Sequence, residues 1–415
     1  MGDPTASGDA LGTILRTAAM LHDSGQSTSM TLTAVDRLGR GLDQPAVVVP
    51  GWATITAYDP RPGGTVLVTA TRPVSVNMRR VAAVMRAVDE AEDRPLAAAE
   101  IEQTLADAGR LTTSSTPVFV AACAAGAAAL AVVFGATDPR AVVMVAAAAA
   151  VGGLLRRLLG RLSVGPLVEV FVAALVAGVT GAIAMHVDLG HAAALVAVCP
   201  AMVLVPGPQI LIGAMDLLAL RMSLGVARIS YATLILATIA AGLVIGLRVG
   251  GQTLPLTSPG AHVPFVADVL AAGVAAACYP VFFSMPYRLI GWPVAAGMAA
   301  HALHWWSVTV WHAGLPLAAF LSCLLVGAAL TPIAYRHRIP FAAVGFAAVV
   351  ALVPGMYVFR TVAGLIAMVG APTNTLLLET TVNGVTAALT VVGMAVGLAL
   401  PTRVRDWLLD RSVRT

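Results

Sequence analysis

Most of the chain, from Pro117 to the region of Pro401, consists of long apolar stretches separated by short polar loops. A helix needs about 20 apolar residues, at 1.5 Å per residue, to cross roughly 30 Å of hydrocarbon, and many of these stretches approach that length. Hydrophobic residues make up 58% of the 415 residues and charged residues 11%, whereas a soluble domain carries about 25% charge. Too little polar surface remains to cover a globule in water, so the sequence predicts an integral membrane protein.

Ten apolar segments are candidates for membrane-spanning helices. They are 117–134, 139–155, 165–186, 190–205, 225–247, 263–284, 289–304, 313–334, 339–353 and 376–399. Two further apolar segments, 208–222 and 356–369, follow the fourth and ninth spans and are too short to cross. The sequence therefore predicts a mainly α-helical, polytopic membrane protein with about ten transmembrane helices.

The arginines indicate an orientation for these helices. Placing the N-terminus inside the cell puts 12 of the 25 arginines in inside loops and the tail, three in outside loops, and ten in the first 112 residues. An excess of basic residues on the cytoplasmic side is the usual determinant of topology. We therefore expect both termini in the cytoplasm. The net charge of +4 is small and the basic residues are scattered, which argues against a nucleic-acid partner.

The first 112 residues hold much of the charge and resemble a small α+β domain. Helical periodicity covers 11–21, 31–42 and 76–88, and β-branched and aromatic residues mark strands at 46–49, 52–58 and 65–71. Pro95 is expected to open a last helix that Gly109 ends. The first apolar stretch is short and interrupted by Arg16 and His22, so we expect no signal peptide and a cytoplasmic domain.

A four-residue string, Leu-Val-Pro-Gly, occurs at 204–207 and again at 352–355, each time at the end of a predicted span. Three spans precede each copy, and a short apolar segment and a full span follow it. Since five helices per half is an odd number, the second half must enter the membrane from the opposite side, as in the inverted repeats of secondary transporters. The predicted repeats are 113–250 and 251–401, followed by a tail at 402–415.

Each Leu-Val-Pro-Gly string should break its helix, because proline removes a backbone donor and glycine permits unusual dihedral angles. A break in a membrane helix persists only where it is buried in protein or lines a wet cavity. The segment after the break presents unpaired N–H groups and the positive end of a helix dipole. We therefore expect Pro206, Gly207, Pro354 and Gly355 to face each other from opposite leaflets and to shape a substrate site.

Nearly the whole chain resembles the threonine/serine exporters, in the form that fuses the two subunits of the two-subunit exporters. In the first half the resemblance lies in Val132-Val133-Phe134-Gly135, Leu154-Leu155-Arg156-Arg157, Leu204-Val205-Pro206-Gly207, Asp216-Leu217-Leu218 and Gly225-Val226-Ala227-Arg228. In the second half it lies in Met285-Pro286-Tyr287-Arg288, Ala318-Ala319-Phe320, Arg338-Ile339-Pro340, Leu352-Val353-Pro354-Gly355 and 357–360. In the N-terminal domain it lies in Ser24-Gly25-Gln26-Ser27-Thr28 and the stretch from Val76-Asn77 to Leu105.

The resemblance implies export of threonine and serine, driven by the proton-motive force, across a bacterial cytoplasmic membrane. Succinate efflux has been linked to two-subunit relatives, so a dicarboxylate stays open as an alternative substrate. A membrane sensor with a signalling N-terminal domain is a second alternative. The partners expected are the small-molecule substrate, protons and lipids, and self-association stays open.

An amino acid is a zwitterion, so its site must offer donors to a carboxylate and acceptors to an ammonium group. Aligning the ends of the fifth and tenth spans sets Arg228 opposite Glu379, and we hypothesise that the two pair or divide the substrate's charges. The alternatives are a positive-inside anchor for Arg228 and an interfacial acid for Glu379. Arg360 is a further candidate for the carboxylate, with a headgroup anchor as its alternative.

Ionisable residues at membrane depth are costly, so each is a functional candidate. The candidates for proton coupling are, in order, Asp216, Glu379, Asp268 and Glu169. Asp268 and Glu169 lie near the starts of their predicted spans, so a solvated interfacial acid is the alternative for both and is favoured for Glu169. Polar residues near the breaks or on the last span could bind substrate or only join helices; they are Gln209, Asn383, Thr380 and Thr381.

Other chemistry finds little support in the sequence. His301 and His304 lie one helical turn apart, but no neighbouring acid or cysteine completes a metal site, so interfacial packing is favoured. The four cysteines are far apart in apolar runs, which excludes a disulfide framework. The chain contains no Walker A loop, His-Glu-x-x-His or Gly-x-Ser-x-Gly. We therefore expect no enzyme activity, no metal and no cofactor.

Overall fold

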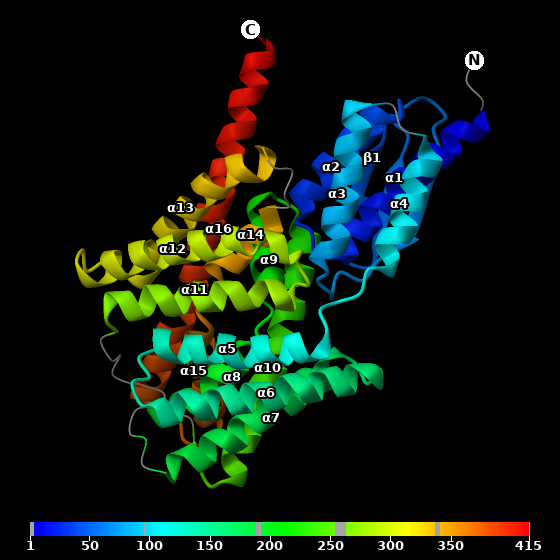
Figure 1. Cartoon of the computed structure of the whole chain (residues 1–415). Helices are drawn as coiled ribbons and strands as arrows, with labels where there is room; N and C mark the ends of the chain where they lie inside the picture. Colours follow the sequence, from blue (N-terminus) through cyan, green and yellow to red (C-terminus); the bar gives the residue numbers. More distant parts are fainter. Residues whose placement is uncertain are drawn as a thin grey trace.

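The computed structural model in Figure 1 describes residues 4–94, 97–187, 189, 192–253, 263–336 and 341–414. The chain is mainly helical, with one small sheet near the N-terminus. Pro95, expected to open a helix, and the Arg338-Ile339-Pro340 string lie outside the described residues.

The first elements are four helices and a three-stranded sheet, here called the N-terminal unit, in which α1 and α2 pack against the sheet and α3 and α4 pack against other helices. Its elements are α1 (Pro4–Asp23), α2 (Thr28–Gly41), β1 (Val47–Pro50), β2 (Thr54–Tyr58), β3 (Val66–Ala70), α3 (Met78–Asp93) and α4 (Ala98–Arg110). The strands are antiparallel in the order β1-β2-β3. Alternation along β2 turns Ile55 and Ala57 into the core. The side chains of Ser27 and Asn77 cap α2 and α3 by accepting backbone N–H groups. The predicted helices and strands of this region are confirmed, and α1 begins earlier than expected.

The remaining helices form a bundle beside the N-terminal unit, which Figure 1 shows in blue to cyan. The first half contains α5 (Thr116–Val133), α6 (Pro139–Arg161), α7 (Pro166–Met185), α8 (Ala192–Met202), α9 (Gly207–Leu218) and α10 (Met222–Val249). The second half contains α11 (Phe265–Phe282), η1 (Tyr287–Leu289), α12 (Gly291–Thr309), α13 (Leu315–Arg336), α14 (Phe341–Val349), η2 (Val350–Leu352), α15 (Gly355–Gly370) and α16 (Asn374–Arg414). Each half therefore contains six described α-helices, and the second half has two short 3-10 turns in addition.

Within the described residues, seven helices are long and apolar enough to cross a membrane, or up to nine if each of two bent helix pairs is one span. The bent pairs are α8 with α9, at 67°, and α14–η2 with α15, at 56°. The ten predicted spans include 289–304, which corresponds to α12. This helix is not among the nine spans that the structure supports. That helix carries His301, His304 and three tryptophans, which lower its apolar character. The structure thus supports a multi-pass membrane protein with seven to nine such spans in its described part.

The two halves use the same helix contacts. In the first half α7 packs against α10, and in the second half α13 packs against α16, as the most extensive contacts of the bundle. Both contacts depend on glycines four residues apart. A Cβ on Gly242 or Gly246 would collide with the carbonyl oxygen of Phe171 or Leu175, and a Cβ on Gly393 or Gly397 would crowd the carbonyl oxygen of a residue on α13. Small residues at this spacing let membrane helices approach closely.

Candidate functional site

The two Leu-Val-Pro-Gly strings form the same local structure. Pro206 has φ −78° and ψ 60°, and Pro354 has φ −78° and ψ 47°. In each turn the glycine N–H donates to the carbonyl of the residue before proline, Gly207 to Val205 at 2.8 Å and Gly355 to Val353 at 2.7 Å. These are inverse γ-turns centred on proline. They end one helix and start the next at an angle, which confirms the predicted helix breaks.

The two breaks lie against each other in the middle of the bundle. A Cβ on Gly207 would lie 4.0 Å from Cγ2 of Val353, and a Cβ on Gly355 would lie 3.1 Å from Cε of Met202. Only a small gap of about 10 Å³ remains between them, and its lining is apolar except for Tyr279. The breaks therefore meet as expected, but the contact between them is an apolar constriction.

A cavity of about 240 Å³, here called the first-break cavity, opens at Pro206 and the start of α9. Its wall carries two oppositely charged side chains, Arg156 from α6 and Glu169 from α7, together with Gln209. Gln209 is 6% exposed. Within the described residues, the buried Nε of Arg156 has no hydrogen-bond partner. This cavity therefore offers a cation, an anion and an amide within one small space.

The N-terminal unit forms one side of the first-break cavity. Its segment Val74-Ser75-Val76 lines the cavity opposite the membrane helices. Trp52 lies with its ring centroid 5.3 Å from that of Tyr231, which also lines the cavity. A molecule approaching from this side must therefore pass the N-terminal unit.

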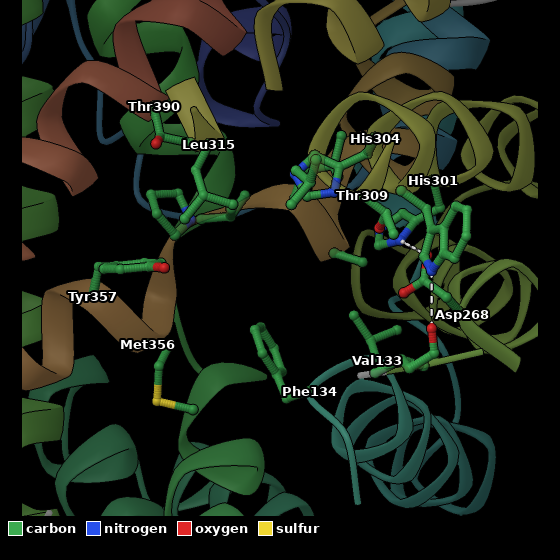
Figure 2. A pocket seen from close by; sticks show the side chains of 17 residues that line it. Val133, Phe134, Asp268, His301, His304, Thr309, Leu315, Met356, Tyr357 and Thr390 are labelled. Atoms are coloured by element: carbon green, nitrogen blue, oxygen red, sulfur yellow. Dashed lines mark hydrogen bonds and ion pairs between the residues drawn. The ribbon is translucent and has the colours of Figure 1, made fainter. Parts of the chain in front are cut away.

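A second cavity of about 350 Å³, the second-break cavity, opens at Pro354 and the start of α15. Figure 2 shows Asp268 and His301 on one side of it and Tyr357 and Met356 on the other. Nδ1 of His301 lies 3.1 Å from Oδ2 of Asp268. His301 is 2% exposed and Asp268 is 6% exposed. The structure thus joins two residues that are 33 positions apart in the sequence.

Residues of helix α11 line both cavities. Asp268, near its start, lines the second-break cavity, and Phe282, at its end, lines the first-break cavity. The 14 residues between them (282 − 268) span roughly 21 Å at 1.5 Å per residue. The cavities therefore lie towards opposite ends of α11, with the apolar constriction at the breaks between them.

Asp216 binds the N-terminal unit to the bundle. Thr28 donates its hydroxyl to Oδ2 of Asp216 at 3.0 Å, and Arg221 donates Nη1 to Oδ1 at 3.2 Å. Nε of Arg228 lies 3.2 Å from Oδ2, at ion-pair distance but without hydrogen-bond geometry. Asp216 and Arg228 are each 1% exposed. The structure thus gives Asp216 partners at a domain contact and places it on neither cavity wall.

His22 completes this buried contact from the N-terminal unit. Nη2 of Arg228 lies 3.4 Å from Nδ1 of His22, and Nε2 of His22 lies 3.2 Å from the carbonyl oxygen of Gly51. This arrangement suits a neutral ring with its proton on Nε2, which donates to Gly51 and leaves Nδ1 to accept from Arg228. Burial, assisted by the nearby Arg228 charge, lowers the pKa of His22 to about 4.

Backbone contacts extend this attachment to the second half. The first amides of α3, Met78 and Arg79, donate to the carbonyls of Phe283 and Ser284 at 2.8 and 3.1 Å. These amides are unpaired within a helix, so the segment after α11 acts as their cap. Ser114 donates its hydroxyl to the Val281 carbonyl at 2.9 Å. The N-terminal unit therefore touches both halves.

The expected pairing of Arg228 with Glu379 is wrong, because Arg228 pairs with Asp216 instead. Arg403 on α16 donates to the carbonyl of Leu218, just before α10 begins. The end of α16 therefore lies near the start of α10. Glu379 is 24 residues earlier in α16 (403 − 379), roughly 36 Å away along a helix. Arg228 and Glu379 thus lie far apart, although they align as equivalent positions of the two halves.

The other candidates from the sequence have separate environments. Thr380 is buried where α15 crosses α16, against Gly364. Asn383 is partly exposed and donates to the Glu379 carbonyl. Thr381 is exposed and bonds within its helix. Arg360 is partly exposed, and its buried Nε has no hydrogen-bond partner among the described residues. None of these four lines either cavity.

Two residues of the cavities were not candidates from the sequence. In the sequence, Arg156 is one of several arginines that indicate orientation, and the surroundings of His301 favour interfacial packing. The string Leu154-Leu155-Arg156-Arg157 contributes to the family resemblance, but nothing in it indicates that Arg156 lines a cavity. The spacing of His301 and His304 drew notice, yet the acid that contacts His301 comes from another helix. Among the described residues, no group of three His, Cys, Asp or Glu side chains could hold a metal ion.

Comparison with known families agrees with this architecture. The threonine/serine exporter model ThrE matches residues 12–250, which hold the N-terminal unit and the first half. A second model, described as Threonine/Serine exporter, ThrE, matches residues 268–404 in the second half. No curated protein and no solved structure matches the chain. With both parts matched in succession, the chain belongs to the threonine/serine exporter family, as a member that fuses the two halves in one polypeptide.

Proposed function

We propose that the protein exports small zwitterionic amino acids, threonine and serine, across a bacterial cytoplasmic membrane, driven by the proton-motive force. The observation that carries this proposal is the first-break cavity, where Arg156 and Glu169 line one small space with Gln209. The substrate carboxylate would bind the Arg156 guanidinium, and its ammonium group would bind Glu169. Charge-assisted hydrogen bonds of this kind are the strongest available at such a site.

The start of α9 contributes less to anion binding than a usual helix N-terminus. Gly207 uses its N–H in the turn and Pro208 has none, so the backbone amide of Gln209 is the remaining donor of the first three positions. Arg156 therefore supplies the positive charge that the carboxylate needs. Tyr231 and Tyr279, on the same wall, are suited to the hydroxyl of threonine or serine.

Transport would proceed by alternating access between two inverted repeats, 113–250 and 251–401. The equal turns at the two breaks and the matching glycine contacts support this topology. Opening the apolar constriction would connect the two cavities in turn. The N-terminal domain, residues 1–112, would lie in the cytoplasm with the tail, 402–415, and border the entry to the first-break cavity.

Counterflow of labelled threonine in proteoliposomes tests the proposal. We expect exchange in the wild type, and at least a tenfold loss in Arg156→Gln and in Glu169→Gln, because each removes one charge-assisted bond worth about 1.5–3 kcal/mol. Arg161→Gln is the matched control, since Arg161 is an exposed arginine on the same helix and lies off the cavity wall. It should exchange threonine normally.

The same assay separates the alternatives. Unlabelled serine should compete with threonine, whereas succinate, which lacks an ammonium group for Glu169, should not. Competition by succinate alone would indicate a dicarboxylate exporter. Absence of counterflow in folded wild-type protein, at any imposed pH gradient, would refute transport and favour a sensor.

A further inference from the structure

The second-break cavity contains a buried acid–base pair that substrate binding does not require. Asp268, the fourth residue of α11, and His301, the eleventh residue of α12, contact each other at 3.1 Å on its wall. Ionisable groups inside membrane segments are costly and mark ion or proton pathways. The presence of two such groups on the wall of the second-break cavity therefore requires an explanation.

Helix packing alone does not explain the pair. In the first half, the residues at the same positions of the corresponding helices are Phe119, fourth in α5, and Ala149, eleventh in α6. Both are buried and apolar. At these positions the first pair of helices has no acid–base contact, and the Arg157 guanidinium instead lies 4.1 Å from the centroid of the Phe119 ring. Packing two such helices therefore does not require an acid–base pair.

The geometry leaves one position for a proton. In a neutral His301, Nδ1–H would donate to Oδ2 of Asp268, which leaves Nε2 as an acceptor. Nε2 is buried and has no hydrogen-bond partner among the described residues. A proton added there would form an N–H bond and convert the pair from a net charge of −1 to zero.

Few other groups titrate near the pair. His304, on α12, and Tyr357, on α15, line the same cavity. The ring centroids of His301 and His304 are 6.0 Å apart. The segments packed against α11, namely α5, α14 and η2, contain no charged residue, and α12 contributes no carboxylate. Asp268 is therefore the acid of this cavity's wall, and His301 is the base in contact with it.

We infer that Asp268 and His301 are the proton-carrying pair of the transport cycle, a role that rests on the proposed export function. A widening of the second-break cavity would bring water to the buried Nε2 of His301 and deliver the proton there. The same N–H bond would break to release the proton to water once the cavity communicates with the other side. Closing the cavity removes water from the pair. The desolvation cost is larger for a pair with a net charge of −1 than for an ion pair whose net charge is zero. Protonation would thereby favour closure of this cavity.

Proteoliposomes with an internal pH-sensitive dye test this role through three readouts: threonine counterflow at equal pH, threonine transport driven by a pH gradient, and the threonine-dependent proton flux that the dye reports. In Asp268→Asn and His301→Gln we expect counterflow within about twofold of wild type. Gradient-driven transport and threonine-dependent proton flux should fall at least tenfold. His304→Gln is the matched control, a histidine on the same helix and cavity wall that is not bonded to Asp268, and it should retain all three activities.

The inference is overturned if Asp268→Asn and His301→Gln still couple transport to the pH gradient, or if they lose counterflow and gradient-driven transport alike while remaining folded. If Asp268→Asn does not fold, His301→Gln decides the matter alone, because glutamine keeps a hydrogen-bonding group towards Asp268. A wild type without counterflow refutes the export function itself, which is a separate result.

Discussion

At the scale of single residues, Asp216 is contacted from three places in the chain: Thr28 in α2 and Arg221 before α10 donate hydrogen bonds to it, and Arg228 inside α10 forms an ion pair with it. A buried charge without partners costs several kcal/mol, whereas a paired one is tolerated. Arg228, the largest fully buried side chain, depends on this carboxylate and on His22. The first broken helix and the N-terminal unit are thereby fastened at one point.

His22 makes this attachment dependent on pH. Because its pKa is about 4 when docked and its usual value is 6.5, the docked state keeps its full stability above pH 6.5 and loses stability as the pH falls from 6.5 towards 4. The loss approaches about 1.4 kcal/mol per pH unit in this window. Hydrogen exchange of α1 and α2 amides at pH 7 and pH 5 should show faster opening at pH 5.

His22→Gln provides the comparison for this experiment, since glutamine cannot be protonated and can still bond to Gly51 or Arg228. We expect its α1 and α2 amides, after correction for intrinsic exchange, to respond less to pH. Equal pH dependence in the variant and the wild type would show that another group controls docking.

At the scale of elements, two helix pairs are in close contact through glycines. Gly242 and Gly246 on α10 lie against carbonyls of α7, and Gly393 and Gly397 on α16 lie against carbonyls of α13. Each pair of glycines is four residues apart, so both face one neighbour. The helices approach until backbone touches backbone, which leaves no room for a side chain.

Gly246→Ala and Gly397→Ala should therefore force their helices apart. Overpacking of this kind costs about 1–3 kcal/mol, so we expect a lower melting temperature in detergent for each variant. Gly370→Ala is the control, because a Cβ there meets no atom within 4 Å. If Gly246→Ala and Gly370→Ala melt at the same temperature, the close contact does not contribute to stability.

At the scale of the whole molecule, the two cavities and the constriction between them define two faces. The first-break cavity adjoins the N-terminal unit, and the second-break cavity lies beyond the paired breaks. In the inverted-repeat topology proposed above, the equivalent breaks would come together from opposite sides. A single rearrangement at Met202, Val205 and Val353 would then exchange which cavity is open.

Labelling with a membrane-impermeant thiol reagent tests these two faces. The four native cysteines are buried, so the background should be low. We expect Gln209→Cys, in the first-break cavity, to react in inside-out vesicles and Thr309→Cys, in the second-break cavity, to react in intact cells. Both sites reacting from one side only would refute the inverted arrangement.

The sequence by itself determined the apolar helices, the two helix breaks and most elements of the N-terminal unit. These follow from local properties: the length of apolar runs, the chemistry of proline followed by glycine, and the periods of helix and strand. The two Leu-Val-Pro-Gly strings predicted their turns because proline lacks an N–H and the following glycine permits unusual dihedral angles. Proline alone is not sufficient, since Pro200, Pro280 and Pro332 lie inside helices.

Only the tertiary structure decided which side chains meet. The contacts of Asp268 with His301, and of Asp216 with Arg228 and Thr28, join different helices, and so does the shared cavity of Arg156 and Glu169. Membrane helices that are apolar on every side give little indication of which face turns inward. The partner of each buried charge is therefore set by how the whole bundle packs, since neighbouring helices can be far apart in the sequence.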